Sequence, residues 1–191
     1  MEKILFFKAM IEKFTDGDFL KKLFSWLAKA IAIAALVYGL YRFVDQWSEI
    51  GEGMEAVLSR IVYQALWLLL VYIVMHIWWM KGVKLSGLKD TDYVLIPTAV
   101  QYTRGFGEMV ASYSIIMSVA QAFIALLLNF TNNSLAEIPL VIHISTESSF
   151  LWSIILVANG VLVGIVLLGV YYLVAEILLV WLEIARNTRK K

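Results

Sequence analysis

Residues 150–182 read FLWSIILVANGVLVGIVLLGVYYLVAEILLVWL, an apolar run of 33 residues in which Glu176 is the single charged side chain. A run of this length and hydropathy predicts a membrane-spanning helix, because it exceeds what a soluble core accommodates. Trp152 lies about 20 residues before Tyr171 and Tyr172, and at about 1.5 Å per residue this spacing matches a hydrocarbon layer of about 30 Å. We therefore expect a transmembrane helix over residues 151–172, with these rings at its two interfaces.

The helix is expected to continue past the membrane as a cytoplasmic extension over residues 173–187. This segment remains apolar, and Glu176 and Glu183 lie one heptad apart on one stripe. A protruding apolar helix needs a protein partner to cover it. An alternative register places the span nearer residues 158–181, with Glu176 inside the bilayer. The first register is favoured because a lone carboxylate in hydrocarbon is costly.

The composition predicts an all-α integral membrane protein with a four-transmembrane-helix bundle. Of the 191 residues, 61% are hydrophobic and only 16% are charged. The apolar runs are continuous rather than alternating, which argues against a β-barrel. The formal net charge of +1 gives no reason to expect nucleic acid as a partner. The absence of cysteine excludes disulfides, thiolate catalysis and cysteine-ligated metals.

The remaining spans are expected over residues 23–44, 61–79 and 109–130. Residues 81–107 then form a cytoplasmic loop, in which Pro97 argues against a continuous helix. Residues 131–149 form an extracytoplasmic loop without lysine or arginine.

The first 14 residues predict an amphipathic helix. Ile4, Phe7, Met10, Ile11 and Phe14 share one helical face, and charged residues occupy the other. Such a helix lies either in the membrane interface or against a partner helix, and both interpretations remain open.

The distribution of positive charge predicts the orientation. Of the 16 lysines and arginines, 14 fall before the first span or just inside its start (Lys29), in the second connection or in the C-terminal tail. Arg42 and Arg60, beside the first connection, are the other two. By the positive-inside rule, both termini are expected to face the cytoplasm.

Small residues predict where helices approach closely. The first span carries a row on one face, made of Ala28, Ala32, Ala35 and Gly39, and the last span carries Gly160 and Gly164 at a small-xxx-small spacing. The second span is bulky on every side. We therefore expect the first, third and fourth spans to pack together or onto partners, with the second outside them.

The third span carries a small and polar stripe that includes Ser114, Ser118 and Gln121. Two interpretations compete. In one, these groups form hydrogen bonds across a tight helix–helix contact. In the other, they line a water-filled path. The first is preferred, because no charged residue lies on that face at mid-membrane depth.

Arg104 and Glu108 stand four residues apart where the third span begins, so they are expected to pair across one helical turn. A structural ion pair is preferred over a gate or a site for a charged substrate.

No enzyme is expected, because the chain lacks catalytic triads, zinc-binding HExxH and P-loop motifs, and no cofactor is implied. Lys29, just inside the first span, is expected to snorkel to the surface. Two functions remain. The first is a non-catalytic subunit or scaffold of a larger membrane assembly, whose partners are the lipid bilayer and other subunits or further copies of the chain. The second is a small homo-oligomeric channel or membrane-perturbing effector, with the third span lining the path. A third function, in lipid handling or membrane remodelling, rests only on the interfacial segments.

Overall fold

The computed structural model describes residues 17–49, 54–88, 94–127 and 149–189. Its elements are the helices α2 (Gly17–Asp45), α3 (Met54–Ser86), α4 (Leu95–Leu127) and α5 (Ser149–Arg189), with a short 3-10 helix, η1 (Gln46–Glu49), after α2. All four α-helices are long and apolar enough to cross a membrane. The expected all-helical, multi-pass architecture is thereby confirmed. The predicted amphipathic helix of residues 1–14 and residues 131–148 of the predicted loop lie outside the described residues.

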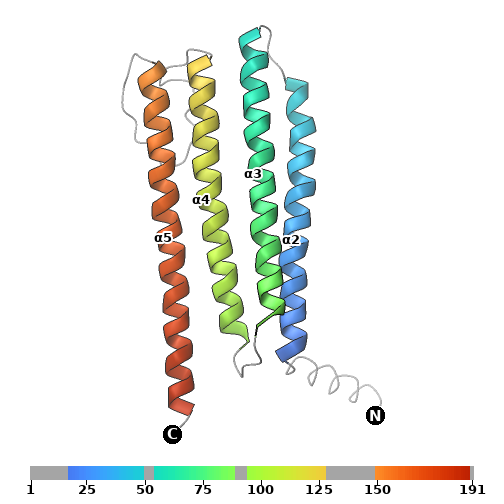
Figure 1. The fold of residues 1–191 in the computed structure, drawn as a ribbon, viewed down its shortest axis with the longest axis vertical. Helices are drawn as coiled ribbons and strands as arrows, with labels where there is room; N and C mark the ends of the chain where they lie inside the picture. The colour runs from blue at the N-terminus through green and yellow to red at the C-terminus, as the bar shows by residue number, and fades with distance from the viewer. Residues whose placement is uncertain (1–16, 50–53, 89–93, 128–148, 190–191) are drawn as a thin grey trace.

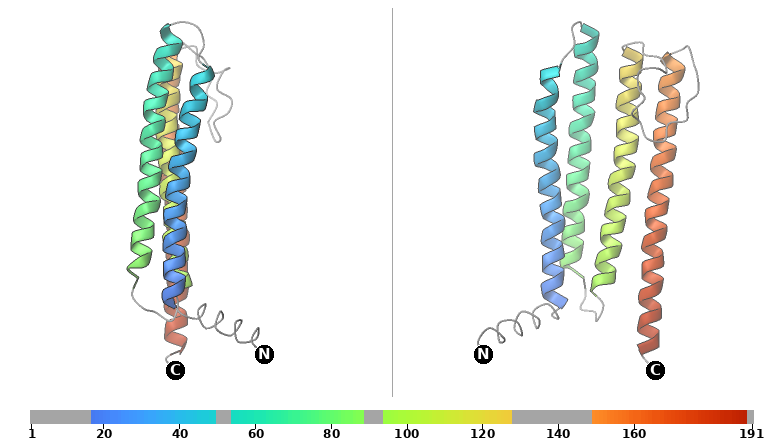
Figure 2. Two further views of the ribbon diagram at one scale, coloured as in Figure 1. Left: turned by 90° about the vertical axis from the view of Figure 1, so that its right-hand side faces the viewer. Right: turned by 180° about the vertical axis from the view of Figure 1, so that it is seen from behind.

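The four helices stand side by side in chain order, in a layer one helix thick (Figures 1 and 2). The main contacts join α2 to α3, α3 to α4 and α4 to α5, and α2 touches α4 only slightly. Within the described residues, α5 contacts no helix except α4. The arrangement is therefore an open row, which leaves both broad faces and the outer edge of α5 uncovered.

The position of α3 corrects the expectation that the second span lies outside the others. This helix lies between α2 and α4 and contacts both. It lacks a small-residue face of its own, but small residues on α2 admit its bulky side chains. On its α4 side, the fully buried Trp78 fills the space between the helices. Complementary size across a contact decides packing, and one helix can supply all the small residues.

The connection between the second and third spans is shorter than the expected loop of residues 81–107. Residues 81–86 belong to α3, and residues 95–107 form the first turns of α4. Pro97 is accommodated because it lies in the first turn of α4, where its missing N–H would have had no helical partner. The Thr98 hydroxyl donates to the carbonyl of Val94 at 2.8 Å and helps close this turn.

The last helix has 41 residues, a length of about 60 Å, and residues 173–187 are helical as predicted. One side of this extension is covered, because the early turns of α4 run beside it. Ala175 is fully buried and Leu182 is 6% exposed. The other side, which faces away from α4, has no cover within the described residues.

Candidate functional site

Within the described residues, the small residues of α2 form its contact with α3, the second span, rather than with the third and fourth spans. Ala28 and Ala32 are fully buried, Gly39 is buried and Ala35 is half-buried. A Cβ added at Gly39 would overlap the side chain of Val71 on α3. The close approach also lets the Trp67 indole N–H donate to the Gly39 carbonyl at 2.9 Å.

The polar stripe of α4 packs against α5. The Ser114 hydroxyl donates to the Gly160 carbonyl at 3.0 Å, and a Cβ added at Gly160 would overlap the side chain of Ser118. At Gly164, an added Cβ would lie 3.0 Å from the side chain of Ile115 and 3.2 Å from the carbonyl of Ala111. The two glycines thus let α5 approach the backbone of α4 closely.

The contact between α4 and α5 is relevant to the interpretation that the polar stripe of α4 lines a water-filled path. Ser114 and Ser118 are engaged between α4 and α5 of one chain, and the Ser118 hydroxyl donates to Ile115 within its own helix at 2.8 Å. The Gln121 Oε1 atom is buried without a hydrogen-bond partner in the described structure. Ser118 is buried in this contact and Ser114 is half-buried at its edge, so both hydroxyls are used in packing rather than directed into an open path.

A cluster of charged and polar side chains joins α3, α4 and α5. The Lys81 Nζ atom donates to Glu108 Oε1 at 2.6 Å, and the Tyr172 hydroxyl donates to the same oxygen at 2.8 Å. Lys81 comes from α3, Glu108 from α4 and Tyr172 from α5. The Lys81 side chain is only 6% exposed and that of Glu108 is 28% exposed, so this pair is largely shielded from solvent.

A second ion pair lies next to the first. The Arg104 Nη2 atom lies 2.5 Å from Glu176 Oε1, and the guanidinium stands 5.3 Å from the centre of the Tyr172 ring. The predicted pair between Arg104 and Glu108 is therefore not formed. Each residue instead pairs with another helix, because α5 brings a carboxylate to Arg104 and α3 brings an ammonium to Glu108. We call Lys81, Arg104, Glu108, Tyr172 and Glu176 the three-helix charge cluster.

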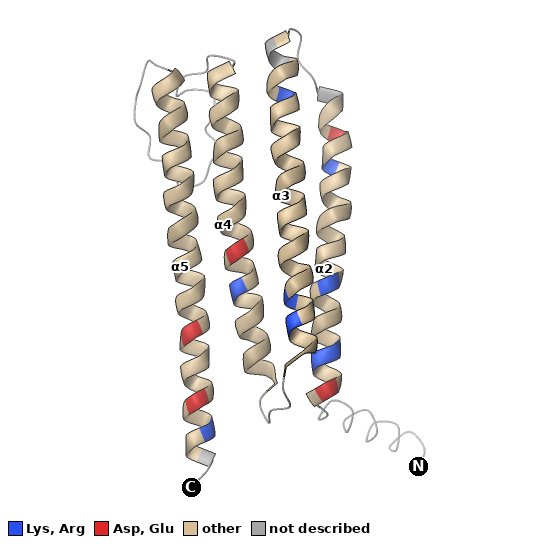
Figure 3. Cartoon of the chain, in the orientation of Figure 1, with Lys and Arg blue, Asp and Glu red and all other residues tan. Residues whose placement is uncertain are grey.

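The three-helix charge cluster marks one end of an uncharged length of all these helices (Figure 3). No Asp, Glu, Lys or Arg occurs over residues 61–80 of α3, 109–127 of α4 or 149–175 of α5. The uncharged length of α3 is 20 residues, about 30 Å, which equals the thickness of a hydrocarbon core.

Aromatic rings pack beside the cluster, on the side toward α2. Trp78 stands edge-on to Tyr102 and Phe106 of α4, with ring centres 5.4 and 4.9 Å apart. The Tyr102 hydroxyl donates to the carbonyl of Phe24 on α2 at 2.8 Å. The aromatic contacts and the ion pairs together join the neighbouring helices beside the three-helix charge cluster. The aromatic rings also limit the access of water to Lys81.

Sequence reasoning missed the cluster as a unit. It named Arg104 and Glu108, but it assigned Lys81 to a loop and treated Tyr172 and Glu176 only as markers of membrane depth. A usable signal existed, because Lys81, Glu108 and Glu176 are each the first charged residue beyond an uncharged stretch, on the same side of the membrane. Charges at equal depth on neighbouring helices are candidates for pairing.

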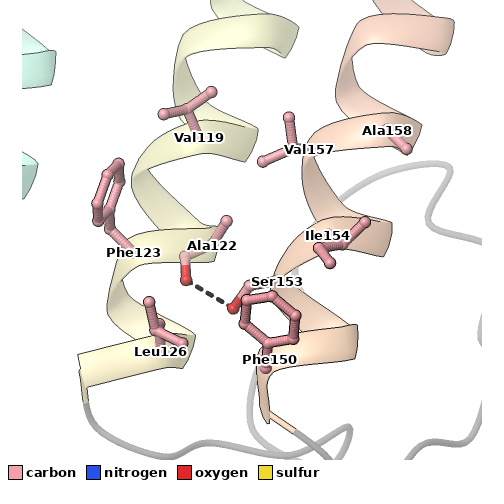
Figure 4. Close-up of a pocket in the computed structure, with 9 residues that line it drawn as sticks. All are labelled: Val119, Ala122, Phe123, Leu126, Phe150, Ser153, Ile154, Val157 and Ala158. Atoms are coloured by element: carbon pink, nitrogen blue, oxygen red, sulfur yellow. Dashed lines mark hydrogen bonds between the residues drawn. The ribbon is translucent and has the colours of Figure 1, made fainter.

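A second feature is a groove between α4 and α5 near their other ends, with a volume of about 420 Å³ (Figure 4). Its lining is almost wholly apolar and comprises Val119, Ala122, Phe123, Leu126, Phe150, Ser153, Ile154, Val157 and Ala158. The Ser153 hydroxyl already donates to the Ala122 carbonyl at 2.8 Å. The groove therefore offers shape to an apolar group but no free polar atom for recognition.

Comparison of the chain with protein-family models, with curated proteins and with solved structures finds no match. Among the described residues, no group of three or more His, Cys, Asp or Glu side chains is placed to hold a metal ion.

Proposed function

We propose that this protein is a non-catalytic integral membrane subunit or scaffold, which acts by binding other membrane protein subunits. The observation that supports this function is an exposed apolar stripe on α5, beyond the three-helix charge cluster. It consists of Leu173, Ile177, Val180 and Ile184, with Trp181 beside it. The exposed fractions of Leu173, Trp181 and Ile184 are 63%, 68% and 59%.

The stripe faces directly away from α4. At 100° per residue, its four members lie within about 60° of one another, and the buried Ala175 and Leu182 lie on the opposite side of the helix. Toward the N-terminus of α5, the same edge continues through Leu162 and Val166, at a depth where hydrocarbon can cover it. Below Tyr172 the helix carries Glu176, Glu183 and Arg186 on its other faces, which places the stripe beside polar surroundings. An apolar stripe in such surroundings is typical of a protein contact.

The open row suits a scaffold. Consecutive helices are held by close contacts and by the three-helix charge cluster, so the layer is fixed without covering either broad face. A partner helix can therefore add to the edge of α5 without displacing a helix of this chain. The channel alternative has less support, because Ser114 and Ser118 are used inside the α4–α5 contact.

We further propose that both termini face the cytoplasm and that the three-helix charge cluster lies at the cytoplasmic boundary. The excess of lysine and arginine in the terminal segments and the second connection supports this orientation. The register with a span over residues 151–172 fits the same boundary, because it leaves Glu176 beside Arg104 outside the hydrocarbon.

The test is purification of the tagged chain from its own membrane in a mild detergent, with light scattering for the mass of the complex and mass spectrometry for its composition. A scaffold predicts foreign subunits in fixed stoichiometry. A clean homo-oligomer or a monomer would overturn the proposal, and conductance measurements in liposomes would then test the channel function.

A matched pair of variants locates the contact. Trp181→Ala with Ile184→Ala should release the foreign subunits, because it removes two of the most exposed apolar side chains in and beside the stripe. Leu162→Ala with Val166→Ala changes the same edge at membrane depth and should retain them. Equal loss in both double variants would show that the stripe is not the contact.

A further inference from the structure

At the end of the row that carries the three-helix charge cluster, some lysines pair with a carboxylate and others do not. Lys81 pairs with Glu108, and Lys21 pairs with Asp18 at 3.3 Å. Within the described parts of the chain, the ammonium groups of Lys22, Lys29 and Lys84 make no ion pair or hydrogen bond. Within the same residues, α4 and α5 carry both members of the Arg104–Glu176 pair, and the unpaired Arg186 of α5 is balanced by the unpaired Glu183, so the excess of positive charge lies on α2 and α3.

Two of these lysines share one face of α2. Lys22, Trp26 and Lys29 are spaced four and three residues apart, which stacks them on one side of the helix. Lys22 and Lys29 are separated by about 10.5 Å along the axis, a span across which two flexible lysine arms can converge. Trp26, between them, is 73% exposed.

The Lys29 side chain lies against α3. Its Cγ and Cε atoms lie 2.8 and 3.5 Å from the point where a Cβ would stand on Gly82 of α3. The absence of a side chain at Gly82 gives the lysine stem a path along α3. The ammonium rests 5.8 Å from the ring centre of Trp79, which is 46% exposed. An apolar stem and an interfacial ammonium are the arrangement of a snorkelling lysine.

We propose that Lys22 and Lys29, flanked by Trp26 and Trp79, bind the phosphodiester group of an anionic phospholipid. The depth agrees with a headgroup, because Lys29 immediately precedes the uncharged residues 30–41 of α2 and lies near the level where Lys81 ends the uncharged part of α3. Lysine binds phosphate as a point charge, and exposed tryptophans lie at headgroup level in membrane proteins. A basic cluster beside a transmembrane helix attracts anionic lipid.

Lys84 provides a matched control. It is exposed and unpaired on the same end of α3, but it stands about 140° around that helix from Trp79 and does not belong to the face made by Lys22 and Lys29. A specific headgroup site and a general attraction of positive charge therefore predict different results for the two sets of lysines.

The experiment is native mass spectrometry of the full-length protein in detergent, titrated with phosphatidylglycerol, phosphatidylcholine or inorganic phosphate. We expect phosphatidylglycerol to be retained in preference to the other two. Lys22→Gln and Lys29→Gln should each weaken its binding about fivefold, since a basic residue near an anionic surface contributes about 1 kcal/mol. Lys84→Gln should leave the affinity unchanged.

Three results would overturn the proposal. Equal retention of the two lipids would remove the role of the negative headgroup. Equal binding of inorganic phosphate would remove the lipid as the ligand. Equal loss in Lys84→Gln would reduce the effect to general surface charge. Unchanged thermal unfolding of each variant serves as the control for folding.

Discussion

A single carboxylate oxygen, Oε1 of Glu108, accepts hydrogen bonds from Lys81 at 2.6 Å and from Tyr172 at 2.8 Å. The three residues belong to three successive helices, so this one oxygen atom links α3, α4 and α5. The lysine is almost fully buried, and an ammonium in such a place is stable only with a counter-ion. Glu108 therefore contributes to both contacts of α4, with α3 and with α5.

Replacing Glu108 by glutamine should destabilise the protein by about 3 kcal/mol, the lower end of the range for breaking a buried ion pair, because Glu108 itself is partly exposed. Reversible unfolding in mixed micelles with increasing denaturing detergent would measure the change. Glu183→Gln removes an exposed carboxylate on α5 that makes no ion pair within the described residues, and it should change stability little. The double variant Lys81→Met with Glu108→Leu should recover most of the loss. If Glu108→Gln and Glu183→Gln behave alike, the three-helix charge cluster does not stabilise the row.

Gly160→Ala should separate α4 from α5. The new Cβ would overlap Ser118 and stand 2.9 Å from the Ser114 carbonyl, and such overpacking costs about 1–3 kcal/mol. Gly169→Ala on the same helix is the matched control, because no atom lies within 4 Å of its Cβ position. The control should be neutral or stabilising by up to about 1 kcal/mol, since alanine favours helix over glycine. Equal effects of the two substitutions on unfolding would contradict the close α4–α5 contact.

The neighbouring tryptophans of α3 should differ in their contact with lipid. Trp78 is fully buried and Trp79 is 46% exposed. In vesicles of brominated lipid, we expect Trp79→Phe to remove a strongly quenched part of the fluorescence and Trp78→Phe to remove a protected part. Trp78→Phe should also lower stability, because the larger ring fills the space against Tyr102 and Phe106. The reverse order of quenching would mean that α3 is turned the other way in the row.

The orientation can be tested by labelling single cysteines, because the chain has none of its own. Asn187→Cys, near the end of α5, should react with a membrane-impermeant maleimide only after the cytoplasmic side is opened. Met54→Cys, at the start of α3, should react from the other side in intact cells. The reversed pattern would contradict an orientation with both termini in the cytoplasm, and labelling of both positions from one side would contradict their placement on opposite sides of the membrane.

The groove between α4 and α5 should be dispensable for folding. Its lining is apolar apart from Ser153, whose hydroxyl lies 2.8 Å from the carbonyls of Ala122 and Ser149 and has its one hydrogen satisfied by them. Phe123→Leu reduces a half-exposed ring on the rim and should change unfolding by less than about 1.5 kcal/mol, the range for conservative hydrophobic exchanges. A larger loss would indicate that the ring packs against a part of the chain that the structure does not describe.

The sequence alone determined the class of protein. Four long apolar runs in 191 residues predict membrane-spanning helices, which satisfy their own backbone hydrogen bonds in lipid. The spacing of Ala28, Ala32, Gly160 and Gly164 also puts small residues on one face of each helix, because close helix approach requires small residues wherever the partner stands. These inferences depend on composition and spacing within one helix.

Only the tertiary structure decided which helices meet. Bulky residues of α3 fit the small residues of α2, and this complementarity places α3 in the row although it has no small face of its own. Arg104 and Glu108 stand one turn apart in sequence, yet each pairs with a different neighbour, because α3 and α5 bring opposite charges to the same depth. Spacing along the sequence shows which charges could pair within one helix. The positions of the neighbouring helices decide which opposite charge actually lies nearest.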